Sequence, residues 1–161
     1  MSQHADLLVV DEMMRHTHKM VMLPRLWSSL SLGQTTLSWQ LFPFQESSRA
    51  LVPQQQGVYA FLIVPDIAGP LQVSYLMYIG ETDRTLRQRF GEYLLEAQSD
   101  NIRPKLLRIL PLYPNHLMFA CSTLQSGIVP KDVETLLIEA FLPPGNDQLP
   151  ASVRRPRKAF Q

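Results

Sequence analysis

Four side chains in this sequence have the types and the order that hydrolysis of a phosphodiester requires. Tyr59 and Tyr78 lie in two neighbouring apolar runs, and Arg89 and Glu134 follow in segments with helical periodicity. A phenol can orient a water molecule or, when its pKa is lowered, accept a proton. A guanidinium binds phosphate oxygens and offsets transition-state charge, and a carboxylate beside a phosphate can hold Mg²⁺. We therefore expect one-metal chemistry at these residues.

Each of these residues, taken singly, has an ordinary structural explanation. Tyrosines in strands usually pack in the core or across the sheet, and a charged residue at the edge of an apolar helical stripe is usually solvated. Gly57 and Gly80 add information because they flank the two tyrosines, and glycine lets another backbone or a ligand approach closely. The functional interpretation therefore depends on the whole set and its spacing.

A predicted hairpin positions the two tyrosines. Residues 57–64 and 73–79 are aromatic and β-branched runs on either side of a turn over 65–70 that contains prolines and a glycine, which predicts two antiparallel strands. Tyr59 lies at the start of the first strand and Tyr78 near the end of the second. Because these ends lie side by side in a hairpin, we expect the two phenols to meet at one end of the sheet.

Two further helices and a third strand are predicted after the hairpin and its following helix. Thr82 or Asp83 can cap that following helix, whose apolar stripe consists of Leu86, Phe90, Tyr93, Leu94 and Ala97. A short helix is expected within 103–110 and a strand over 116–122. A last helix begins at Pro130, because proline suits a first helical turn.

The predicted fold is α+β: a small three-stranded antiparallel sheet flanked by helices, with an N-terminal extension. We divide the chain into an extension of unknown role over 1–50 that packs on the core, a main domain over 51–150 and a basic tail over 151–161. Within the extension, a helix is expected before Pro24.

Four further residues are expected at the substrate. Arg84 and Arg87 are cations close to Arg89 in the sequence, and Arg87 is expected to point more outward. Tyr93, at i+4 from Arg89, lies on the same side of the helix. Asn146 follows a Pro-Pro-Gly stop and can fix that loop through its amide.

Composition constrains the environment more than the function. The net charge of +1 does not by itself indicate a nucleic-acid partner, and the basic tail suits either a solvated end or non-specific phosphate contacts. Cys121 is the only cysteine, which excludes an intrachain disulfide and a metal site built from cysteines, and we expect it in the core. With no signal-peptide pattern and no apolar run of about 18 residues, the sequence predicts a cytoplasmic protein with no membrane partner.

Together these motifs resemble those of the GIY-YIG nuclease superfamily. The first signature corresponds to Gly57-Val58-Tyr59 and the second to Tyr78-Ile79-Gly80, and the segment YIGETDRTLRQRF places the active-site arginine of that family at Arg89. The last motif corresponds to Glu134, Ile138, Pro143 and Asn146. The resemblance covers roughly residues 55–147. Two positions depart from the family pattern: Tyr93 stands where some members have histidine, and Glu81 where several have lysine.

The resemblance implies a divalent-metal-dependent endonuclease that hydrolyses DNA. Glu134 would hold Mg²⁺ or Mn²⁺, Tyr59 would activate or orient the attacking water with help from Tyr78, and Arg89 would stabilise the pentacovalent charge. Glu81 would repel DNA unless it faces away or contacts the metal. One active site cuts one strand per event, so a double-strand break would need a homodimer or two visits.

The alternative is a catalytically weak or inactive module of the same fold that binds nucleic acid or a protein partner. Retention of all four side-chain types favours the enzyme. The modest net charge and Glu81 favour the alternative.

Overall fold

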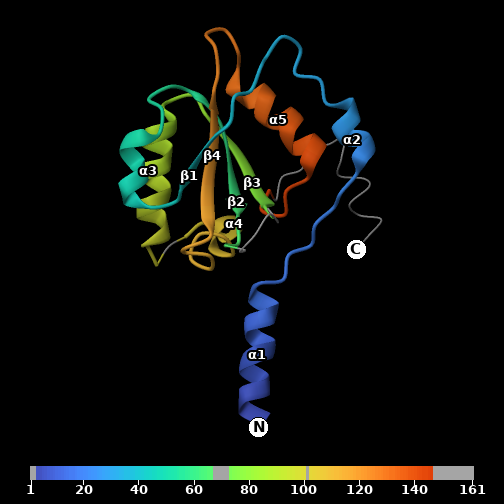
Figure 1. Ribbon diagram of the computed structural model, residues 1–161, viewed down its shortest axis with the longest axis vertical. Coiled ribbons are helices and arrows are strands. Elements are labelled where there is room, and N and C mark those ends of the chain that lie inside the picture. The colour runs from blue at the N-terminus through green and yellow to red at the C-terminus, as the bar shows by residue number, and fades with distance from the viewer. Residues whose placement is uncertain (1–2, 67–72, 101, 147–161) are drawn as a thin grey trace.

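The computed structural model describes residues 3–66, 73–100 and 102–146. Its centre is a four-stranded antiparallel sheet in the order β1-β4-β2-β3 (Figure 1). The strands are β1 (Gln40–Pro43), β2 (Gly57–Ile63), β3 (Tyr75–Thr82) and β4 (Leu117–Thr123). The helices are α1 (Gln3–Arg15), α2 (Pro24–Ser29), the 3₁₀ helix η1 (Glu46–Leu51), α3 (Leu86–Ala97), α4 (Pro104–Leu107) and α5 (Pro130–Phe141).

The α+β class and the antiparallel sheet are confirmed, but the predicted number of strands is wrong. The additional strand, β1, comes from the N-terminal extension and pairs with β4, with Phe42 opposite Phe119. Its four residues end at Pro43, and proline in a sheet is confined to edge strands and strand ends. A strand this short carries little periodicity of its own, so its pairing depends on the exposed edge of β4.

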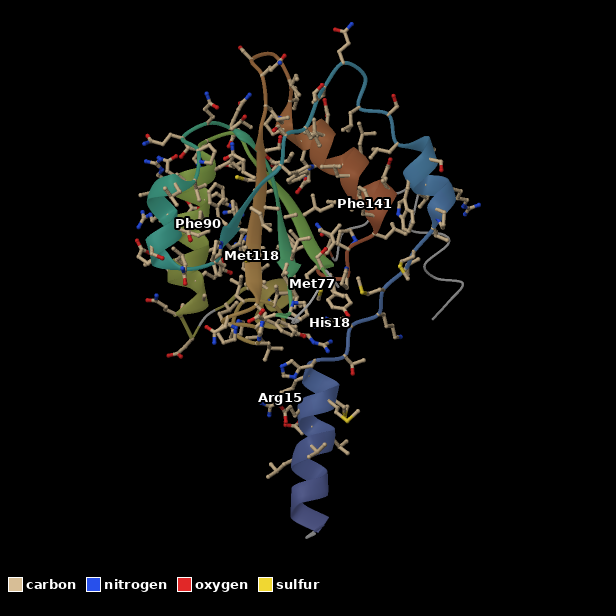
Figure 2. The ribbon with its side chains drawn as sticks, viewed as in Figure 1. Arg15, His18, Met77, Phe90, Met118 and Phe141 are labelled. Atoms are coloured by element: carbon tan, nitrogen blue, oxygen red, sulfur yellow. The ribbon has the colours of Figure 1, made fainter. Side chains whose placement is uncertain are left out.

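The two faces of the sheet carry separate cores. One face packs against α3 and η1, where Phe90 of α3 points toward the sheet and lies edge-on to Phe119, with ring centroids 5.1 Å apart (Figure 2). The other face packs against α5 through Val133 and Leu137. The sheet therefore separates α3 from α5, so a site that uses both helices must form at an end or an edge of the sheet.

The N-terminal extension contributes more than the single expected helix. A helix before Pro24 is present, but α1 ends at Arg15 and Pro24 itself begins α2. α2 packs on α5, whereas α1 projects away from the sheet (Figure 1). Arg108 donates hydrogen bonds to three carbonyls at the end of α1, and His18 Nε2 lies 2.9 Å from the Tyr113 hydroxyl. A cavity of about 540 Å³ at this junction is lined by Met14, Arg15, Leu107, Arg108, Pro111 and Leu112.

The start of α3 differs from the prediction in a way that the sequence explains. β3 continues to Thr82 instead of ending at Ile79, and the helix cap is Thr85. The Thr85 hydroxyl accepts from the Gln88 N–H at 3.1 Å, and the Gln88 side chain accepts from the Thr85 N–H at 3.3 Å. This reciprocal capping box satisfies two N–H groups that the first turn leaves free.

Several remaining predictions concern the core and the ends of the chain. Cys121 is buried as expected, and burial raises the pKa of its thiol to about 12. Part of the predicted turn over 65–70, and the whole basic tail over 151–161, lie outside the described residues. None of the helices in the described ranges combines the length and the apolar character that a bilayer crossing needs.

Candidate active site at one edge of the sheet

The two glycines of the signatures are explained by close backbone approaches. In the β2–β3 pairing, Tyr59 lies opposite Gly80, and a Cβ at Gly80 would lie 2.5 Å from Cζ and Oη of Tyr59. The Tyr59 ring therefore crosses the space that any other side chain at position 80 would fill. A Cβ at Gly57 would overlap the carbonyl oxygen of Ser122 on β4. Glycine is thus required on both sides of the tyrosine for steric reasons.

Tyr59, Arg89 and Tyr93 form one hydrogen-bonded group between β2 and α3. The hydroxyls of Tyr59 and Tyr93 are 2.8 Å apart, and Arg89 Nε donates to the Tyr59 hydroxyl at 3.1 Å. The Arg89 guanidinium also lies over the Tyr93 ring, 4.7 Å from its centroid. The i,i+4 spacing of Arg89 and Tyr93 places both on the helix face that meets the sheet. The structure therefore brings together three of the predicted site residues.

Burial determines the protonation state of this group. Burial raises the pKa of the Tyr59 phenol well above its ordinary value, and burial raises the pKa of Tyr93 to about 12. Both phenols are therefore neutral near pH 7 and can donate hydrogen bonds. Burial alone would lower the pKa of Arg89, but the neighbouring phenols and Glu92 raise it overall, so the guanidinium keeps its positive charge.

Tyr78 connects the Tyr59–Arg89 group to α5. Its ring lies on the same face as that of Tyr59, with the centroids 6.4 Å apart. The pKa of Tyr78 is raised overall, mainly by burial and also by the negative charge of Glu134. A hydrogen bond with Tyr93 and the positive charge of Arg89 act in the opposite direction. Groups from both helices thus act on one phenol. This is feasible because β3 is an edge strand, around which α5 can reach.

Glu134 is a buried carboxylate with an ammonium partner. It is 7% exposed, and Lys131, one turn earlier on α5, forms an ion pair with it. Glu81 is close enough for the two acids to interact: burial raises the pKa of Glu81 and the charge of Glu134 raises it further, whereas Lys131 and Arg89 lower it. In the β2–β3 register Glu81 lies opposite Val58, so its side chain is on the α5 face of the sheet and faces away from the Tyr59 and Tyr78 rings.

The donor set at this edge fits one hard divalent cation. Mg²⁺ is commonly bound by one or two carboxylates, with water and substrate oxygens completing its shell. Glu134 is one such carboxylate, and the ammonium of Lys131 shows that a cation fits against its Oε2. Within the described ranges no group of three or more histidine, cysteine, aspartate or glutamate side chains could hold a metal, so the described residues offer no larger cage.

The two other predicted arginines are engaged elsewhere. Arg84 is exposed and pairs with Glu92, which also accepts a hydrogen bond from Arg89 at 2.9 Å. Arg87 does not point outward as predicted. Its guanidinium donates to the carbonyls of Val52 and Ala50 at 2.8 and 2.7 Å and fastens α3 to the end of η1. Its direction is set by those carbonyls, whose position the helical periodicity of α3 does not reveal.

Asn146 closes the free edge of β3. Its Oδ1 accepts from the Ile79 N–H at 2.9 Å, and its Nδ2 donates to the Ile79 carbonyl at 2.8 Å. The adjacent Gly145 N–H donates to the Met77 carbonyl at 2.8 Å. The buried amide therefore fixes the loop after α5, as the sequence indicated, and both of its hydrogen-bonding ends contact the strand backbone.

Two cations near the tyrosines were not singled out from the sequence. Arg103 lies over the Tyr93 ring, 5.1 Å from its centroid, and Lys105 Nζ lies 5.3 Å from the Tyr78 ring centroid. Both were visible only as members of a basic cluster around Pro104. Their approach to the sheet depends on how the connection after α3 turns back, and local spacing does not encode that.

Comparisons with protein-family models, with curated proteins and with solved structures find no match to this chain. The resemblance to GIY-YIG nucleases therefore stays a prediction made from the motifs.

Proposed function

We propose that this chain is a divalent-metal-dependent endonuclease of the GIY-YIG type that hydrolyses DNA phosphodiester bonds with one metal ion. The observation that supports this most strongly is the hydrogen-bonded group of Tyr59, Arg89 and Tyr93, with the Tyr78 ring 6.4 Å from that of Tyr59. The charge of Glu134 on α5 also reaches this group, since it raises the pKa of the Tyr78 phenol. In this proposal a phosphate binds beside the Arg89 guanidinium, and Glu134 holds the metal ion.

The protonation states support specific roles for the phenol and the guanidinium. Because burial raises the pKa of Tyr59, this residue acts as a neutral hydrogen-bonding group that orients the attacking water. Arg89 is held by Tyr59 and Glu92 and still carries its charge, so it stabilises the additional negative charge of the pentacovalent transition state. Tyr93 holds the Tyr59 hydroxyl in place.

Glu134 would hold Mg²⁺ or Mn²⁺. A bound divalent ion supplies a Lewis acid for the phosphate oxygens and lowers the pKa of its own water. Lys131 competes for this carboxylate, because its ammonium pairs with Glu134 Oε2. DNA as substrate, and a homodimer as the route to a double-strand break, belong to this proposal.

One observation favours the second candidate function, a module of this fold that binds nucleic acid or protein without turnover. Both charged groups assigned to catalysis already have internal partners, Glu92 for Arg89 and Lys131 for Glu134. If these ion pairs persist in the complex, the protein binds DNA and does not cut it.

Plasmid cleavage distinguishes the two functions. The wild-type protein is expected to nick supercoiled plasmid with Mg²⁺ or Mn²⁺ and to leave it intact in EDTA. Glu134→Gln should slow nicking by about 100-fold or more, because losing a metal ligand costs more activity than losing a residue that only hydrogen-bonds to a ligand. The control Glu139→Gln, on the same helix, should nick at the wild-type rate. Melting temperatures of the three proteins should agree within a few degrees. Binding without nicking would support the second function, and rapid nicking by Glu134→Gln would exclude the proposed metal site.

A further inference from the structure

One cation at the site has no acidic partner among the residues that the structure describes. Arg84, Arg89 and Arg103 each form an ion pair with a glutamate of α3, and Lys131 pairs with Glu134. Lys105 forms no ion pair with any residue in the described part of the chain, although its ammonium lies over the Tyr78 ring. Within the described ranges no carboxylate neutralises its charge, so the ammonium can meet an anion.

The scaffold holds Lys105 in this position from both sides. Arg103, two residues earlier, donates through Nε and Nη2 to the two carboxylate oxygens of Glu96 at 2.8 and 2.6 Å, and its backbone N–H donates to the same carboxylate at 2.9 Å. Leu106, the next residue, is fully buried in the core cluster that contains Tyr78. The backbone at Lys105 is thus anchored, and its half-buried stem presents the ammonium beside the site.

We propose that Lys105 binds a DNA backbone phosphate adjacent to the phosphate at Tyr59 and Arg89, an inference that rests on the proposed function. Lysine is a compact point charge with three rotatable donors, which suits a phosphate whose orientation is not fixed. A contact of this kind positions the strand and carries no sequence information. It adds affinity by releasing a counterion, so its contribution falls as salt rises.

Binding without cleavage tests this assignment. Fluorescence anisotropy of a labelled DNA duplex in EDTA, at salt concentrations from about 50 to 200 mM, would be measured for the wild type, Lys105→Met, Lys105→Arg and Lys19→Met. Loss of one phosphate contact lowers the slope of log K against log salt by about 0.9. The affinity deficit of Lys105→Met should therefore be about 3- to 4-fold larger at the low end of this range than at the high end. Lys105→Arg should retain the slope, and Lys19→Met, an exposed control outside every helix and strand, should also retain it.

The outcomes separate this inference from the proposed function. A wild type that binds DNA with the same salt slope as Lys105→Met would overturn the role of Lys105 and leave the nuclease proposal intact. A wild type with no salt-dependent DNA binding would overturn both. In steady-state cleavage, Lys105→Met should raise KM and change kcat by less than about 2-fold, because a flanking phosphate contact is the same in ground and transition states. A lower kcat at unchanged KM would contradict the assignment.

Discussion

Removing the Asn146 amide should destabilise the whole domain, because this side chain completes the edge of β3. Asn146→Ala removes two buried hydrogen bonds, of 2.9 and 2.8 Å, and leaves both the N–H and the carbonyl of Ile79 without a partner. A typical hydrogen bond contributes about 0.5–1.5 kcal/mol net, and an unsatisfied buried group costs about 1–3 kcal/mol. Since water can reach an edge strand once the loop loosens, we expect a loss of about 2–4 kcal/mol in unfolding free energy.

Urea unfolding followed by far-ultraviolet circular dichroism measures this loss. A decrease of this size is a large part of the total stability of about 5–15 kcal/mol expected for a domain. The matched control is Asn115→Ala, an exposed asparagine in the turn before β4, which should change the unfolding free energy by less than about 0.5 kcal/mol. An equal, small effect of the two substitutions would refute the claim that the amide closes the sheet edge.

Three further predictions concern α3 and its contact with the sheet. Arg89→Ala should slow plasmid nicking by about 10²- to 10³-fold. Arg87→Ala should mainly lower the melting temperature, because it loses the hydrogen bonds from α3 to the end of η1. Equal losses of nicking rate in the two variants would show that the catalytic arginine was misassigned. Gly80→Ala should lower stability by about 1–3 kcal/mol, because its Cβ would overlap the Tyr59 ring, and an unchanged urea midpoint would contradict this contact. Burial alone would raise the pKa of Glu96, but the hydrogen bonds and charge of Arg103 lower it overall. The Glu96–Arg103 ion pair therefore stabilises the fold fully above the pKa that Glu96 has in the unfolded chain, and this stabilisation is lost as pH falls through the pKa of Glu96 in the folded protein. The stability difference between wild type and Glu96→Gln should therefore be full at pH 7 and shrink below about pH 4.

The central elements of this fold were predictable from the sequence. α3 and α5 each carry an apolar stripe at helical spacing, and β2 is a short run of aromatic and β-branched residues that begins at a glycine. β1 lacks such a pattern, and its pairing with β4 spans much of the chain. The cap of α3 had a signal in the sequence, Thr85 with Gln88 at the third helical position, but Thr82 and Asp83 offered competing caps. Which of these residues caps α3 depends on where β3 ends, and the strand includes Thr82.

The same distinction between local and long-range information applies to the site. Hairpin register and helical spacing were enough to place Tyr59, Tyr78 and Arg89 together. The partners of Arg87 and the approach of Lys105 could not be predicted, because each depends on a segment that returns from elsewhere in the chain. Nuclease activity, DNA as substrate, the metal, the homodimer and the cytoplasmic location stay predictions.

The position of a bound metal ion tests the central claim most directly. Crystals grown with a DNA oligonucleotide and Mn²⁺ would locate the ion by its anomalous scattering. We expect one Mn²⁺ bound to the Glu134 carboxylate, with Lys131 displaced and a phosphate oxygen between the ion and Arg89. A Glu134 still paired with Lys131, with Mn²⁺ absent or bound at another surface, would contradict the proposed active site.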